Sequence, residues 1–151
     1  MSDLQVPYDK IAESGVIGCC IASHSGYLLA ATRLEPGDFY RPLHQELFKA
    51  CSQLAHLDGA DLDTRDRRVE LAAELAGVEI ERVQRTLDKR LTMTDKSGTL
   101  ARRVKRSSEA RRLMAAAADV FNRLSAGEPL ETVLGDADAS IRHLLTAGRP
   151  A

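Results

Sequence analysis

The stretch that decides the fold of this chain is Asp38-Phe39-Tyr40-Arg41-Pro42, which is followed by His44, Leu47 and Phe48. The 151 residues include three Tyr, three Phe and no Trp, and half of these rings fall within this short stretch. Aromatic side chains bury large apolar areas, and Pro is well suited to the first turn of a helix. We therefore expect a helix that begins at Pro42 and a small core anchored by Phe39, Tyr40, Leu47 and Phe48.

Apolar residues recur at helical spacing on both sides of this stretch. Leu43, Leu47, Cys51 and Leu54 predict a helix over 42–57. Before it, Asp9 is placed to cap a helix over 9–22, and the turn 23–26 precedes a short helix over 27–33. After it, Thr64 and Gly77 are typical of the two ends of a helix, and apolar residues from Val78 to Leu91 predict another.

The C-terminal third has the pattern of two long helices joined by a short turn. The polar segment 92–98 precedes a helix over about 99–124, which Ser125-Ala126-Gly127 ends, and Pro129 stands near the start of a last helix. We predict an all-α protein with a helical head, residues 1–95, and an antiparallel helical hairpin, residues 96–151, within one structural domain.

Composition excludes several classes of protein. Hydrophobic residues make up 44% and charged residues 28%, as in an ordinary soluble domain, and the net charge of −1 provides no global attraction for nucleic acid. The longest apolar run, 15–22, is too short to cross a membrane, and the N-terminus has no basic signal region. We expect a cytoplasmic protein without membrane contact. Its three Cys do not make a disulfide framework.

No arrangement of residues predicts catalysis. Lys96-Ser97 lacks the glycine loop of a P-loop, and no Gly-x-Gly-x-x-Gly motif is present. The four His and three Cys lack the short paired spacings of a metal site, and a thiol within an apolar helix is inert. The sequence therefore predicts no catalytic residue, no cofactor and no metal.

One basic patch follows the polar segment. Five cations lie on the predicted helix over about 99–124, whose other face is apolar. They are Arg102, Arg103, Lys105, Arg106 and Arg111. They could track phosphates of nucleic acid, attract an acidic protein, or form only the solvated face of the helix. No aromatic stacking platform accompanies them, which favours the solvated face over indirect or direct DNA contact.

The hairpin carries a long, Ala-rich apolar stripe. Two helices alone do not cover both sides of such stripes, so a partner surface or a second copy is indicated. The alternative is that the stripe packs back on the head.

The chain resembles the N-terminal domain of the bacterial replicative helicase DnaB over nearly its whole length. Residues 11–21, Ile-Ala-Glu-Ser-Gly-Val-Ile-Gly-Cys-Cys-Ile, are similar to the first helix of that family, and the block from Asp38 to Phe48 is similar to its Asp-Phe-Tyr segment and following helix. Residues 100–104 and 111–113 match the spacing of the family's hairpin. The middle of the chain, at 63–65 and 77–80, echoes the family pattern only loosely.

The resemblance implies a scaffold, because the chain stops where the linker to the family's motor would begin and contains no P-loop. In that family the hairpins pair, and the domains form a collar that contacts primase. Carried over to this chain, the pairing surface would be lined by Leu113, Ala117, Val120, Leu124, Leu134 and Ile141. The expected function is a non-catalytic replication module that forms a dimer or higher homo-oligomer or docks on a replicative helicase or primase. The alternatives are a nucleic-acid-binding regulator and an inhibitor of helicase assembly.

Overall fold

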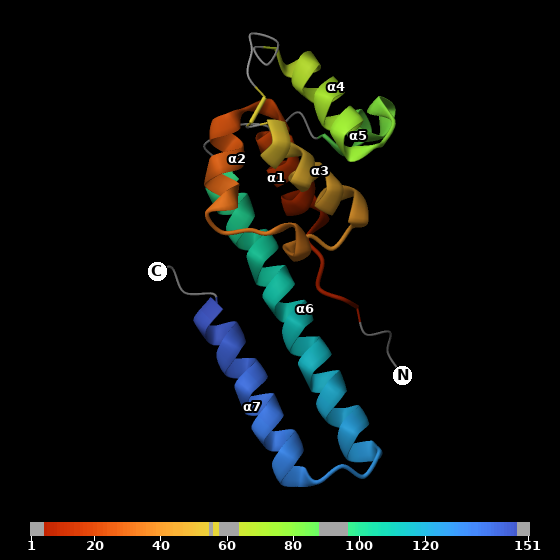
Figure 1. The fold of residues 1–151 in the computed structure, drawn as a ribbon, viewed down its shortest axis with the longest axis vertical. Helices are drawn as coiled ribbons and strands as arrows, with labels where there is room; N and C mark the ends of the chain where they lie inside the picture. Colours follow the sequence, from red (N-terminus) through yellow and green to blue (C-terminus); the bar gives the residue numbers. More distant parts are fainter. Residues whose placement is uncertain (1–4, 55, 58–63, 88–96, 148–151) are drawn as a thin grey trace. The chain divides into compact units, whose positions relative to one another are not determined.

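The computed structural model describes residues 5–54, 56–57, 64–87 and 97–147. Within these ranges all regular structure is helical, which confirms the all-α prediction. The chain divides into two compact units (Figure 1): the head, Tyr8–Arg106, and the hairpin, which comprises Ser107 onward together with the residues before Tyr8. Of the polar segment 92–98 that we predicted as the boundary, all but its last two residues lie outside the described part. The observed division falls farther on, inside a helix.

The centre of the head is helix α1, Lys10–Ala22. Asp9 caps it as predicted, because its side chain accepts a hydrogen bond from the N–H of Ala12 at 3.0 Å. Helices α2, His24–Ala31, α3, Pro42–Leu54, and α4, Arg65–Ala76, all contact α1. Because α1 is covered on several sides, almost every residue from Ala12 to Ile21 is buried (Figure 1).

Helix α2 begins three residues earlier than the sequence pattern indicated. The Ser23 hydroxyl accepts a hydrogen bond from the N–H of Gly26 at 3.0 Å, so the residues predicted as a turn form the first turn of the helix. Gly26 also permits a close approach to α1, since a Cβ atom there would lie 2.3 Å from the carbonyl oxygen of Cys19.

The short 3-10 helix η1, Pro36–Asp38, leads the chain into α3. Phe39, Leu47 and Phe48 are buried, and the rings of Phe39 and Phe48 lie 5.0 Å apart. Tyr40 is not part of this core. Its side chain is 46% exposed and packs at the surface on Tyr8, because successive side chains of the extended backbone after η1 point in opposite directions.

Helices α4 and α5 pack against each other within the head. Thr64 caps α4 and Gly77 ends it in the left-handed conformation, with φ +69°, as the sequence indicated. Helix α5, Ile80–Thr86, is shorter than the predicted 78–91, and residues 88–91 lie outside the described part. Helix α3 ends at Leu54 rather than at residue 57.

Helix α6, Ser97–Ser125, belongs to both units. Its first turns place Leu100, Ala101 and Val104 in the core of the head. Its remaining length runs antiparallel to α7, Leu130–Ala147, and the two are joined by a short turn (Figure 1). The two-helix hairpin predicted from the sequence is thus present.

Candidate functional site

The hairpin has one buried strip and one exposed strip on α7. Val133 is 1% exposed and Ala137 and Leu144 are partly covered, so these three residues mark the side that packs toward α6. Leu134 and Ile141 lie beside these residues on the helix surface, about one position farther round from the side that packs toward α6. Their side chains are 56% and 41% exposed. Helix α7 therefore presents a row of apolar side chains that α6 does not cover.

Helix α6 has a matching exposed strip. Leu113 and Leu124 are about half exposed, and Phe121 is 71% exposed. On each helix, the exposed strip follows by about one residue the side chains that face the other helix. Because the two helices are antiparallel and this offset has the same direction on both, the two strips lie on the same side of the hairpin. We call these residues the apolar face of the hairpin: Leu113, Phe121, Leu124, Leu130, Leu134, Ile141 and Leu145.

Four of the six side chains that the resemblance placed at an interface lie on this face, namely Leu113, Leu124, Leu134 and Ile141. Ala117 is also exposed, whereas Val120 is half buried. Sequence reasoning missed Phe121, the most exposed large apolar residue of the described chain. A single aromatic residue in an Ala-rich helix was the signal that could have identified it.

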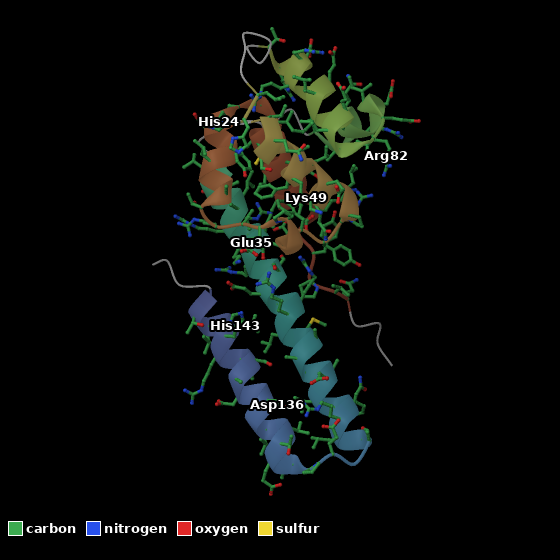
Figure 2. All side chains as sticks on the ribbon, in the orientation of Figure 1. His24, Glu35, Lys49, Arg82, Asp136 and His143 are labelled. Atoms are coloured by element: carbon green, nitrogen blue, oxygen red, sulfur yellow. The ribbon has the colours of Figure 1, made fainter. Side chains whose placement is uncertain are left out.

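Arg123 fastens the turn between the two helices. Its guanidinium contacts Glu128 in the turn at 2.7 Å and Asp136 on α7 at 2.8 Å, and Figure 2 shows Asp136 on the side of α7 that faces α6. Hydrogen bonds to these two carboxylates raise the pKa of Arg123. Both carboxylates are exposed, so we assign Arg123 a local role in orienting the turn rather than a large contribution to stability.

The basic patch is largely held by partners of its own. Arg103 pairs with Asp9 at 2.9 Å and Lys105 with Asp38 at 3.3 Å, both within the head. In the hairpin, Arg111 donates a hydrogen bond to the carbonyl oxygen of Pro7 at 2.8 Å. Arg102, Arg103 and Arg106 are all exposed, but Arg103 is engaged with Asp9, so Arg102 and Arg106 are the cations on which a nucleic-acid contact would chiefly depend.

A buried polar pair joins the Asp38–Phe48 block to α1. The Nδ1 atom of His44 lies 2.8 Å from Oε1 of Glu13, and both side chains are about 1% exposed. The other carboxylate oxygen of Glu13 accepts a hydrogen bond from the N–H of Tyr40 at 2.8 Å. Sequence reasoning singled out His44 but not Glu13, although a lone carboxylate within the apolar stretch 11–21 was a signal for it.

The thiols do not form a reactive site. Cys19, Cys20 and Cys51 are free and buried, and burial raises the pKa of Cys51 to about 12 and that of Cys20 well above its usual range. Thiols held in the neutral form are poor nucleophiles and poor ligands. Among the described residues, His, Cys, Asp and Glu side chains form no group that could hold a metal ion.

None of the helices in the described part of the chain is both long and apolar enough to cross a bilayer. The fold and its hairpin define a helical domain with an uncovered apolar face. A family model described as the DnaB-like helicase N-terminal domain matches residues 5–106. The chain therefore belongs to this family, which is associated with DNA replication.

A solved structure agrees with this assignment. The crystal structure of the N-terminal domain of DnaB helicase from Mycobacterium tuberculosis matches with a TM-score of 0.75 and 25% sequence identity. The match covers 91% of this chain and 99% of that chain, so the similarity extends over the head and most of the hairpin. The predicted fold, that of a DnaB N-terminal domain, is confirmed.

Proposed function

We propose that this chain is a non-catalytic interaction module of DNA replication that self-associates through its hairpin, or docks by the same face on a replicative helicase or primase. The observation that carries the proposal is the apolar face of the hairpin. Phe121, Leu134 and Leu145 are each more than half exposed, at 71%, 56% and 61%. A contiguous apolar surface of this kind is typical of a protein–protein interface.

The same face suits pairing of two copies. Ala117 and its Ala-rich neighbours allow helices to approach closely, while Phe121 and Leu134 provide large side chains that a partner could bury. Asp138 stands between Leu134 and Ile141 on α7 and pairs with Arg142 at 2.9 Å, so this face also carries charged groups. Protein interfaces commonly combine an apolar centre with charged and polar residues at the rim.

The test is the oligomeric state of the full chain by size-exclusion chromatography with light scattering. We expect a dimer or larger species, and we expect Phe121→Ser with Leu134→Ser to shift it to a monomer while the helical circular-dichroism signal is unchanged. The matched control is Ile11→Ser with Leu28→Ser, because these head residues are also large, apolar and half exposed or more, at 60% and 50%. A strict monomer that also fails to bind replicative helicase and primase would overturn the proposal.

The nucleic-acid alternative rests on Arg102 and Arg106, which are exposed. Binding to single- and double-stranded DNA across salt concentrations tests it, since phosphate contacts weaken steeply with salt. With Arg103, Lys105 and Arg111 engaged elsewhere, we expect weak binding and little change in Arg102→Glu with Arg106→Glu. Strong binding that this double substitution abolishes would favour the regulator over the scaffold.

A further inference from the structure

The head contains a second feature, which the apolar face of the hairpin does not involve. A cavity of about 270 Å³ opens where the start of α1, the start of α3 and helix α5 meet. Four cationic side chains from these elements line it: Lys10, Arg41, Arg82 and Arg85. Among the described residues that line the cavity there is no carboxylate.

The described residues provide no carboxylate partner for these cations. Within the described part of the chain none of the four forms an ion pair, and Arg85 donates instead to the uncharged carbonyl oxygen of Glu81, at 3.3 Å. Arg82 projects from the surface of α5 (Figure 2). Lys10 lies on α1, Arg82 and Arg85 lie on α5, and Arg41 directly precedes α3. All four side chains are exposed, so water screens their mutual repulsion, but an anion bound between them would be attracted by all four.

His44 forms part of the wall of the same cavity. The side chain lines the cavity and is 1% exposed, and its Nδ1 is held by Glu13. Its Nε2 has no hydrogen-bond partner among the described residues. A buried ring nitrogen without a partner is unfavourable, and a ligand that reaches it would supply the missing hydrogen bond.

The cavity also lies at the N-terminal end of α3. Arg41 precedes the helix, and Leu43 and His44, in its first turn, line the cavity. The N-terminal end of a helix carries a partial positive charge and favours anions. The partial positive charge at this end of α3 therefore adds to the positive charge of the four cations.

We propose that this cavity binds the phosphate groups of a small phosphorylated ligand, of the pyrophosphate or nucleotide polyphosphate class. Four cations match the charge of a di- or triphosphate better than that of a single carboxylate. The volume is just below the ~300–1,000 Å³ of sites that enclose drug-sized ligands. The phosphates would occupy the cavity, and the remainder of a larger ligand would extend into solvent.

The first experiment is calorimetric titration of the full chain with pyrophosphate, ATP and inorganic phosphate at constant ionic strength. We expect saturable one-to-one binding, with pyrophosphate and ATP at least tenfold tighter than phosphate. Arg41→Gln with Arg82→Gln should weaken binding by tenfold or more. Arg102→Gln with Arg106→Gln is the matched control, because these two residues are exposed like Arg41 and Arg82 but do not line the cavity.

A second measurement follows His44 directly. Since the chain has only four His, its imidazole ¹⁵N resonances can be assigned, and we expect the Nε2 resonance of His44 to shift on addition of pyrophosphate. Absence of saturable binding, an equal loss in the two double variants, or a silent His44 resonance overturns the proposal. Binding of single-stranded DNA through Arg41 and Arg82, with no binding of the small phosphates, also overturns it.

Discussion

Glu13 Oε1 and His44 Nδ1 lie 2.8 Å apart in the buried core of the head, and they join α1 to α3 across 31 positions of sequence. The second oxygen of the same carboxylate fixes the backbone N–H of Tyr40. One side chain thus pairs with two donors, one buried and one partly buried, at the point where the chain enters α3. Because unpaired polar groups in a core are costly, this small network specifies how α1 and α3 pack.

We expect Glu13→Ala to lower the free energy of unfolding by about 3 kcal/mol, because it leaves His44 and the Tyr40 N–H without their buried partner. Urea denaturation measures the change. Glu46→Ala is the control, since Glu46 pairs with Lys49 at the surface, where both side chains are about half exposed, and it should change stability by less than about 1 kcal/mol. Equal effects of the two substitutions would contradict the role given to Glu13.

The two neighbouring rings of the Asp38–Phe48 block should respond very differently to truncation. Phe39 is 1% exposed, so Phe39→Ala should cost about 3–5 kcal/mol of stability. Tyr40→Ala should cost about 1 kcal/mol, which corresponds to the loss of its surface contact with Tyr8, whose ring lies 4.9 Å away. Thermal unfolding of both variants tests the pair. A large loss for Tyr40→Ala alone would reverse the assignment.

Local signals predicted the helices well wherever capping or periodicity fixes them. Asp9, Thr64 and Gly77 cap or end their helices because each of these effects involves only a few adjacent residues. The start of α2 was predicted too late, since Ser23 can form either a turn or a helix cap. The exposure of Tyr40 depends on which way the extended backbone runs after η1. The residue types in this stretch do not indicate that direction.

The candidate sites were harder to predict because they combine distant segments. The apolar face of the hairpin was partly visible as a helical stripe on α6 and α7. The cavity was not, because Lys10, Arg41 and Arg82 approach one another only after α1, α3 and α5 have packed. Glu13 and His44 likewise have no local relationship, and each by itself resembles an ordinary polar residue.

Arg68 should be a large contributor to the stability of the head. It is 6% exposed, and its guanidinium donates hydrogen bonds to the carbonyl oxygens of Ile21 and Cys20 at the C-terminal end of α1. A cation there also complements the helix dipole. Arg68→Leu should therefore lower stability by about 2–4 kcal/mol, because two carbonyl groups lose a charged donor.

The neighbouring Arg67 provides the control for this change. It is exposed on the same helix and pairs with Glu70 at 3.0 Å, so Arg67→Leu should change stability by less than about 1 kcal/mol. Chemical denaturation of the two variants gives the comparison. Similar midpoints for both would mean that Arg68 does not hold the end of α1.

Cys51 should make the stability of the head fall at alkaline pH. Below about pH 9 the thiol is protonated in both the folded and the unfolded chain, so its contribution to the free energy of unfolding is fully present there. Between pH 9 and the folded pKa of about 12 the unfolded chain loses this proton while the folded chain keeps it. The folded state then binds more protons, and stability should fall by up to about 1.4 kcal/mol per pH unit.

Comparison with Cys51→Ala isolates this contribution from the other groups that titrate in the same range. The variant loses apolar packing at all pH values, but its stability should fall less steeply above pH 9. Denaturant unfolding at several alkaline pH values measures both slopes. Cys20, whose pKa burial also raises, acts in the same direction and remains in both proteins. Identical slopes would show that Cys51 ionises as readily in the folded state as in the unfolded state.

Arg123 should control the order of the turn between α6 and α7. The backbone N–H groups of Ala126, Gly127 and Glu128 are bonded to carbonyl groups of the last turn of α6, at 3.0–3.1 Å, and Arg123 clamps Glu128 beside them. In Arg123→Gln we expect faster amide hydrogen exchange at these three positions, with the helical content unchanged. Arg142→Gln is the control, because Arg142 pairs within α7, with Asp138 at 2.9 Å, and not with a residue of the turn that the structure describes. Since the clamp is solvated, added salt should narrow the difference between the natural chain and Arg123→Gln. Unchanged exchange at Ala126–Glu128 would show that the backbone bonds alone hold the turn.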